Sequence, residues 1–377
     1  MENERSDIDP GGLLEYSVVF SDRSLNHMSQ SFQGVMRDVS STLKRVYKAQ
    51  SAVLIPGGGT YGMEAVARQF ATDKSCLVIR NGWFSYRWTQ IFEMGSIPSE
   101  STVLTASQIS EDEYAPFCPP AVDEVIDSIR RLRPEVVFAP HVETAAGIIL
   151  PDDYITAVSE AVHEVSGLFV LDCVASGALW VDMEATGVDV LISAPQKGWS
   201  GSPCSALVML SPLAVDRLTS TSSTSFATDL RKWKEIMEAY ENGAHAYHAT
   251  MPTDSLRQFH RVMEETERFG FLEAQKNQEE LGRQVRSLLS RAHVKSVAGP
   301  GFEAPSVVVS YTDDPGVQNG AKFSALGIQV AAGVPLMCNE PQDFQSFRIG
   351  LFGLDKLANV DRTVRRLENV LGQVLNG

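Results

Sequence analysis

One lysine, Lys197, follows a hydrophobic run so closely that its charge requires an explanation. Residues 188–192 are mostly apolar and β-branched and predict a core strand. Pro195 and Gly198 flank the lysine and prevent a regular helix from following. On this stretch alone, a surface lysine in a loop is the commoner outcome. A lysine at the end of a core strand costs desolvation free energy, however, and condensation of its amine with a carbonyl removes that charge.

An aspartate occupies the corresponding place upstream. Residues 167–171 predict another buried strand, and Asp172 closes it. A carboxylate there needs a cationic partner, and a protonated pyridine nitrogen is one such partner. Pyridoxal phosphate requires both an imine-forming lysine and an acid on its ring nitrogen. The interval from Asp172 to Lys197 can hold a helical turn or two and a strand, which would bring both side chains to one edge of a sheet.

A glycine-rich turn, residues 56–62, follows the strand predicted at 51–55. Its glycines match the G-x-G-x-x-G spacing of dinucleotide-binding enzymes, so an NAD(P)-dependent oxidoreductase is a competing interpretation. That fold requires an acid at the end of the next strand, whereas residues 76–79 lead into Arg80. What remains is anion binding: backbone N–H groups at a helix N-terminus hold a phosphate.

Predicted strands alternate with predicted helices through the first two thirds of the chain. This alternation predicts an α/β fold with a mostly parallel sheet covered on both faces. Ligands of such sheets bind beyond the carboxyl ends of the strands. Gly59, Thr144, Asp172 and Lys197 all follow predicted strands, so we expect them to converge there.

Three motifs carry a resemblance to a known family. Residues 172–176 with 193–198, the turn 141–147, and Phe347-Arg348-Ile349-Gly350-Leu351-Phe352-Gly353 resemble the class V aminotransferases, in particular the alanine–glyoxylate and serine–pyruvate branch. The resemblance implies a fold type I (aspartate aminotransferase-like) architecture: a large pyridoxal phosphate-binding domain with a mostly parallel seven-stranded sheet, plus a small C-terminal α/β domain.

The resemblance also implies roles for individual residues. Lys197 and Asp172 are the expected catalytic residues, and Lys197 carries the cofactor as an internal aldimine. Arg348 is expected to grip the substrate α-carboxylate, and Arg87 to serve structure. Ala145 stands where many members carry a hydroxyl that contacts the ring oxygen. The expected cofactor contacts are Gly59, Thr60, Tyr61, Phe84, Thr144, Asp172, Val174, Gln196, Lys197, Tyr247 and Thr250.

We expect an N-terminal arm at 1–30, a large domain at 31–270 and a small domain at 271–377, with the arm packing against the small domain. In the resembling family, the segment matched by Tyr247 and Thr250 reaches the neighbouring subunit's cofactor. These two residues are therefore expected to act in trans within a homodimer. In the small domain, strands are predicted at 306–311, 328–330 and 346–350.

The expected reaction moves an amino group between an alanine- or serine-like amino acid and a glyoxylate- or pyruvate-like 2-oxo acid. The family's usual N-terminal glycine–proline segment is absent, and residues 16–22 occupy that region. A lyase on the same fold therefore stays open. Cys338, in a predicted loop, raises the specific case of a desulfurase, with a bystander thiol favoured. The oxidoreductase ranks third.

Composition narrows the class of partner. The chain has 377 residues and a net charge of −15, which disfavours nucleic acid and anionic membrane surfaces. The five cysteines are scattered without metal-ligand spacing. We therefore expect no metal site, and we expect the thiols to be reduced. The sequence shows no signal peptide and no run of about eighteen apolar residues. We therefore expect a cytoplasmic enzyme.

Overall fold

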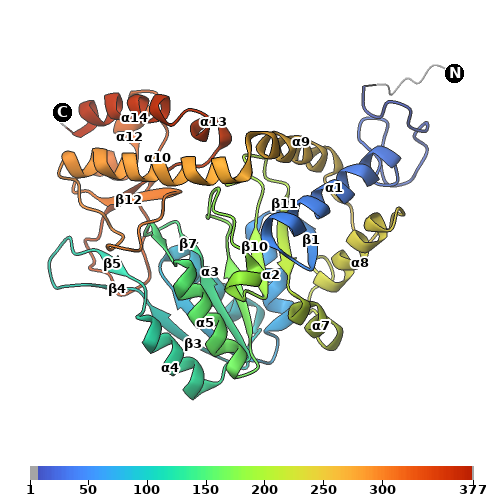
Figure 1. The fold of residues 1–377 in the computed structure, drawn as a ribbon, viewed down its shortest axis with the longest axis horizontal. Coiled ribbons are helices and arrows are strands. Elements are labelled where there is room, and N and C mark those ends of the chain that lie inside the picture. Colours follow the sequence, from blue (N-terminus) through green and yellow to red (C-terminus); the bar gives the residue numbers. More distant parts are fainter. Residues whose placement is uncertain (1–6, 376–377) are drawn as a thin grey trace.

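The computed structural model describes residues 7–375, and within them a seven-stranded sheet forms the centre (Figure 1). Strand β11 is antiparallel to both of its neighbours, and the other neighbouring pairs are parallel. The mostly parallel sheet expected from the sequence is thus confirmed. In spatial order the strands are β1 (Ser51–Pro56), β11 (Ser205–Leu210), β10 (Val190–Ser193), β9 (Leu168–Asp172), β6 (Val136–Pro140), β2 (Ser75–Arg80) and β3 (Glu100–Thr105).

The middle strands are buried along their whole length. Every residue of β6, β9, β10 and β11 is shielded from solvent, as the continuous apolar runs in their sequences require for a sheet covered on both faces. Helices α1 (Gln30–Tyr47) and α8 (Leu230–Glu241) pack on β1, and α2 (Gly59–Phe70) packs on β11. Helix α3 (Trp83–Gly95) packs on β2, and helix α5 (Asp152–Glu164) packs on β9.

Helix α1 illustrates how sequence pattern becomes packing. Ser29 caps it, because its side chain accepts a hydrogen bond from the N–H of Phe32. Its buried face has helical spacing and includes Phe32, Met36 and Leu43. The remaining helices around the sheet are α4 (Val122–Leu132), α6 (Met183–Thr186) and α7 (Pro212–Ser220). Two small hairpins, β4 (Ser107–Gln108) with β5 (Phe117–Cys118) and β7 (Val142–Glu143) with β8 (Ile148–Ile149), complete this part.

Two long helices lead toward the C-terminal part. Helix α9 (Thr253–Phe269) ends at Gly270, and α10 (Phe271–Arg291) begins directly after it. Gly270 has a φ of +101°, a conformation that only glycine adopts readily, so the helical pattern must break there.

The C-terminal part has its own three-stranded sheet and its own core. Strands β12 (Val307–Tyr311) and β13 (Ala331–Ala332) flank β14 (Ser346–Gly350). The strand predicted at 328–330 is therefore wrong in position, because pairing with β14 begins only at Ala331. Helices α11 (Pro315–Gln318), α12 (Ala321–Ala325), α13 (Leu354–Leu357) and α14 (Val360–Leu375) complete this part, in which side chains of α10 and α14 share a hydrophobic cluster.

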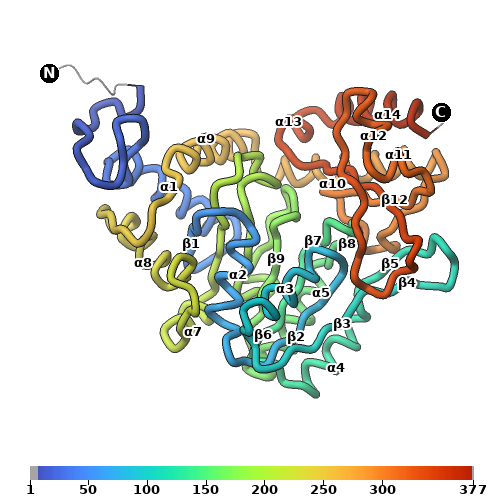
Figure 2. Tube along the Cα trace, turned by 180° about the vertical axis from the view of Figure 1, so that it is seen from behind, coloured from blue at the N-terminus to red at the C-terminus, as the bar shows by residue number. Residues whose placement is uncertain are grey.

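The segment before α1 and the C-terminal helix α14 lie at opposite ends of the molecule (Figure 2). The expected packing of the N-terminal arm against the small domain is therefore not seen; residues of the arm instead bond to α9, where the N–H of Leu25 donates to Asp254. The division at residues 30 and 270 stays a prediction. Among residues 7–375, no helix is both long and apolar enough to cross a membrane.

Candidate active site

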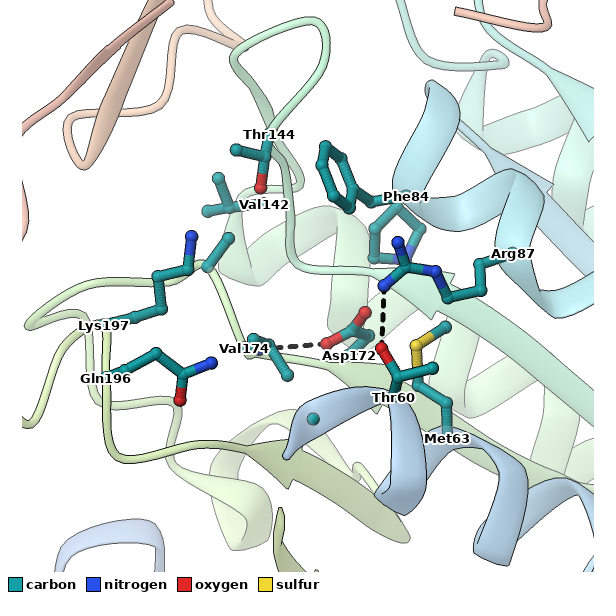
Figure 3. A pocket seen from close by; sticks show the side chains of 13 residues that line it. Thr60, Met63, Phe84, Arg87, Val142, Thr144, Asp172, Val174, Gln196 and Lys197 are labelled. Carbon is teal, nitrogen blue, oxygen red and sulfur yellow. Dashed lines mark hydrogen bonds between the residues drawn. The ribbon is translucent and has the colours of Figure 1, made fainter. Parts of the chain in front are cut away.

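A cavity of about 240 Å³ opens beyond the carboxyl ends of the central strands. The parallel register pairs Asp172 with both Pro140 and Ile192, so the turns after β6, β9 and β10 start at one level of the sheet. Figure 3 shows the side chains that converge there. The cavity is lined by Gly59, Thr60, Met63, Phe84, Arg87, Pro140, Val142, Thr144, Asp172, Val174, Ala175, Gln196 and Lys197.

The glycine-rich turn brings the start of α2 to the cavity. Gly58 precedes the helix in an extended conformation and offers no side-chain cap. Within the described chain, no acceptor bonds the N–H groups of Gly59 and Thr60. A Cβ at Gly59 would stand 2.6 Å from a methyl group of Val174, so only glycine allows this approach. The turn thus presents free N–H groups and the positive end of a helix dipole, which suits an anion.

Asp172 ends β9 with its carboxylate facing the cavity. One carboxylate oxygen accepts a hydrogen bond of 2.9 Å from the N–H of Val174 (Figure 3). Burial raises the pKa of Asp172 to about 6, and the nearby charge of Glu143 adds to this effect. A buried acid of this kind is stabilised by a cation placed in the cavity.

Lys197 lies in the turn after β10, on the other side of the cavity. Its amine stands 4.8 Å from the centre of the Phe352 ring. Burial lowers the pKa of Lys197, and the charge of Arg348 lowers it further, while Asp172 opposes the shift. A larger fraction of the amine is therefore neutral and nucleophilic than for a solvated lysine. Gly198 fixes this turn, because a Cβ there would lie 1.9 Å from the carbonyl oxygen of Gly177.

Phe84 forms an aromatic wall of the cavity, and Glu143 fixes it in place. The carboxylate of Glu143 is fully buried and accepts hydrogen bonds from the N–H groups of Phe84, Ser85 and Ala145 and from the Ser85 hydroxyl, at 2.7–3.2 Å. These bonds cap the first turn of α3 from outside the helix. The start of α3, and with it the direction of Phe84, depends on a residue of the β7 hairpin.

Arg348 approaches the same wall from the C-terminal sheet. Its Nε donates to the carbonyl of Ala332 at 2.8 Å, and its guanidinium carbon lies 5.5 Å from the centre of the Phe84 ring. Burial lowers its pKa. Arg348 borders the cavity across Phe84 without being one of the residues that line it.

Most expected cofactor contacts line the cavity, whereas three do not. Tyr61 is 56% exposed, its ring stands against Gly57, and its N–H is bonded to the Gly58 carbonyl. In this chain its side chain therefore does not reach the cavity, because α2 turns it to another face. Tyr247 and Thr250 are also exposed and bond to each other at 3.0 Å between their hydroxyl oxygens. Contact in trans stays a prediction for this pair.

The cavity also contains residues that sequence reasoning did not assign to it. Met63, Pro140, Val142 and Ala175 supply apolar lining next to the predicted positions. Arg87, for which a structural role was expected, also lines the cavity. The available signal was its position three residues after Phe84, which places both side chains on one face of the helix. The direction of that face depends on where α3 begins.

The lining residues fit pyridoxal phosphate. The free N–H groups at α2 suit its phosphate, Asp172 its ring nitrogen, Lys197 its carbonyl, and Phe84 and Val174 its two ring faces. In the described part of the chain, the side-chain oxygen of Gln196 is buried without a hydrogen-bond partner, which leaves one acceptor for a bound molecule. Within residues 7–375, no group of acidic, histidine or cysteine side chains forms a metal site.

The structure disfavours the oxidoreductase. Strand β1, which leads into the glycine-rich turn, lies at the edge of the sheet, and within residues 7–375 it pairs only with the antiparallel β11. A dinucleotide-binding unit instead places its first strand beside the next parallel strand, which ends in an acid. Here β2 is separated from β1 and ends at Arg80.

The structure also disfavours a desulfurase thiol at Cys338. The side chain is buried, its sulfur lies 3.4 Å from the carbonyl oxygen of Arg80, and burial raises its pKa to about 12. The carboxylate of Glu340 holds the surrounding loop by accepting hydrogen bonds from the N–H groups of residues 336–338. A reactive cysteine on a mobile loop needs the opposite surroundings.

Comparison with known proteins gives an independent view. No known family model matches the chain. It is 26% identical over 260 residues to alanine–glyoxylate aminotransferase 1 of Saccharomyces cerevisiae, covering 64% of each chain. It is 29% identical over 214 residues to the small subunit of a soluble hydrogenase of Synechococcus sp., covering 56% of this chain and 53% of that one. The chain thus spans between half and two thirds of the length of these relatives.

A solved structure, alanine–glyoxylate aminotransferase from Nostoc sp., matches with a TM-score of 0.78 at 20% identity, over 93% of this chain and 89% of that chain. The fold is that of the fold type I pyridoxal phosphate enzymes. The homologues of the chain include alanine–glyoxylate and L-aspartate–glyoxylate aminotransferases, which confirms the resemblance seen in the motifs.

Proposed function

We propose that the protein is a pyridoxal phosphate-dependent aminotransferase. It moves an amino group between an alanine- or serine-like amino acid and a glyoxylate- or pyruvate-like 2-oxo acid. The observation that carries this proposal is the convergence of Asp172, Lys197 and the uncapped start of α2 on one cavity. The names of the homologues support the same reaction.

Gly59, Thr60 and Gln196 hold the phosphate end of the cofactor, while Phe84 and Val174 hold its two ring faces. The bound cofactor supplies a carbonyl for the amino group and an electron sink for the α-carbon. Asp172 keeps a proton on the ring nitrogen through its negative charge. The Nζ atom of Lys197 removes the substrate α-proton and returns it in the reverse half-reaction, and its lowered pKa suits this role.

Arg348 binds the substrate α-carboxylate. Its guanidinium is planar, partly desolvated and oriented by the Ala332 carbonyl, so a two-pronged contact to a carboxylate is available. Thr144 lines the cavity, but Ala145 offers no hydroxyl. The ring oxygen of the cofactor therefore lacks the contact that many relatives provide at position 145.

A homodimer, with Tyr247 and Thr250 contributed in trans, belongs to the proposal. It is supported by their exposure and by the fact that neither residue lines the cavity of its own chain. A cytoplasmic location is supported by the free state of all five cysteines.

An activity screen of amino donors against 2-oxo acceptors tests the function. The protein with added cofactor should convert a donor and an acceptor in equal amounts and show visible absorbance. Ammonia release with turnover from the amino acid alone would establish the lyase instead. A colourless protein that binds NAD(P) would contradict both.

A further inference from the structure

Arg87 points its positive charge into the cavity. Its Nη1 donates to the hydroxyl of Thr60 at 2.8 Å, and its guanidinium carbon lies 5.3 Å from the centre of the Phe84 ring (Figure 3). The side chain therefore connects α3 to the first turn of α2. This is the turn whose N–H groups at Gly59 and Thr60 have no acceptor in the described chain.

The direction of Arg87 is fixed by the start of its helix. Glu143 accepts from two N–H groups in the first turn of α3, and the Ser85 hydroxyl accepts from the N–H groups of Asn81 and Gly82. The first turn of α3 is thereby held by bonds from both sides. Arg87 lies within one turn of this fixed helix start. Its side chain extends across the Phe84 ring to Thr60.

The charges around the cavity indicate which group Arg87 can bind. A phosphate group carries between one and two negative charges, and a helix N-terminus supplies roughly half a positive charge. Among the residues that line the cavity, Lys197 and Arg87 carry the cationic side chains. The amine of Lys197 is assigned to the carbonyl end of the cofactor. Arg87 is thus the cation beside the uncapped helix start.

Pairing with Asp172 is the competing role for Arg87. The charge of Arg87 lowers the pKa of Asp172, but the effects of burial and Glu143 outweigh it. The hydrogen bond made by Arg87 goes to Thr60, while the Asp172 carboxylate bonds to the N–H of Val174. The observed bonding therefore places Arg87 with the anion-binding turn.

We propose that Arg87 binds the phosphate group of the cofactor together with the first turn of α2. This inference rests on the proposed function, because it assumes the same cofactor. It replaces the structural role expected for Arg87 with a direct contact to the ligand. Since a guanidinium bonds a phosphate more strongly than a hydroxyl does, Arg87 is expected to move its donor from Thr60 to the phosphate or to share it between them.

The test compares pyridoxal phosphate with pyridoxal, which lacks the phosphate. Cofactor-free protein is titrated with each ligand, and binding is followed by quenching of tryptophan fluorescence and by visible absorbance. Arg87→Gln should raise the Kd for pyridoxal phosphate roughly 10- to 100-fold, the effect of losing one charge-assisted hydrogen bond. Its Kd for pyridoxal should stay within about twofold of wild type. Arg87→Lys, which keeps the charge without the fork, should fall between these values.

Two controls complete the design. Arg131→Gln, on the exposed surface of α4, should leave both Kd values unchanged. Inorganic phosphate should compete with pyridoxal phosphate in wild type and compete less in Arg87→Gln. The unfolding midpoint of each variant reports whether it folds. If Arg87→Gln does not fold, the comparison of the two ligands is made with Arg87→Lys.

The possible results separate the two proposals. An equal loss of affinity for both ligands, or no loss for either, would overturn the assignment of Arg87 while leaving the cofactor in place. A wild-type protein that binds neither ligand would instead contradict the proposed function. Loss confined to the phosphate-bearing ligand supports the assignment.

Discussion

Asp172, at the end of β9, and Glu143, at the end of β7, are both buried carboxylates, yet their surroundings differ. Glu143 accepts four hydrogen bonds and has no exposed surface. The carboxylate of Asp172 accepts one, from Val174, and faces the cavity. A carboxylate whose bonding capacity is filled by the protein holds structure together, whereas one left partly unfilled is available to a ligand.

The pKa of Asp172 expresses this difference. Burial raises it to about 6, and the nearby charge of Glu143 adds to this effect. Glu143 therefore has two effects on the site: it fixes Phe84 through α3, and it makes a cation next to Asp172 more favourable. Replacing each carboxylate by its amide therefore distinguishes the two roles: an effect on stability is expected at Glu143, and an effect on the reaction is expected at Asp172.

The largest expected effect concerns catalysis at Asp172. In Asp172→Asn, the amide cannot stabilise a positive ring nitrogen, so the turnover rate should fall on the order of 10³-fold at saturating cofactor. Glu143→Gln, measured per mole of folded protein, should lose far less. Similar losses of turnover rate in both variants would show that the catalytic role does not belong to Asp172 alone.

The next largest effect concerns stability at Glu143. In Glu143→Gln, an amide N–H₂ group faces donors at Phe84, Ser85 or Ala145, and at least one of them loses its acceptor. The free energy of unfolding should fall by about 2 to 4 kcal/mol. Denaturant unfolding of the cofactor-free protein measures this loss. An unchanged midpoint would mean that the network around Glu143 contributes little.

Asp172→Asn should have the opposite effect on the stability of the cofactor-free protein. Because the folded-state pKa of this acid is raised, the folded protein is more stable below the unfolded pKa near 4 and loses that stability as pH rises toward 6. The variant lacks this loss. It should match wild type near pH 4 and exceed it by about 1 to 3 kcal/mol at pH 7. Unfolding midpoints across this pH range provide the measurement, and parallel curves would argue against the raised pKa.

A smaller effect is expected at Arg348, which borders the site from the C-terminal sheet. Arg348→Ala should raise KM for α-carboxylate substrates roughly 10-fold or more, with a smaller change in cofactor binding. An amine substrate without a carboxylate serves as the control, since its KM should not change. If KM for the carboxylate substrates stays the same, Arg348 does not bind them.

The sequence predicted the site residues that lie at the end of a strand or in the turn that follows it. Gly59, Thr144, Asp172 and Lys197 converge as expected, because parallel strands bring their carboxyl ends to one edge and local sequence determines where each strand ends. Positions that depend on distant contacts were harder. The direction of Arg87 follows from a cap supplied by Glu143, and the rotation of α2 turns Tyr61 away from the cavity.

Register in the C-terminal sheet posed the same problem. The residues at 328–330 have strand-like composition, but pairing with β14 places the strand at β13. Local pattern identifies a segment able to pair, while the partner strand decides which residues do. The role of Tyr247 and Thr250 depends on a second chain and stays a prediction.

The central claim is that Lys197 forms the covalent bond to the cofactor opposite Asp172. The most direct measurement is to mix the protein with pyridoxal phosphate, reduce with borohydride, digest, and locate the added mass by mass spectrometry. The account predicts one label per chain on the peptide that contains Lys197, and loss of that label in Lys197→Ala. An unmodified Lys197 with label spread over exposed lysines would contradict the account.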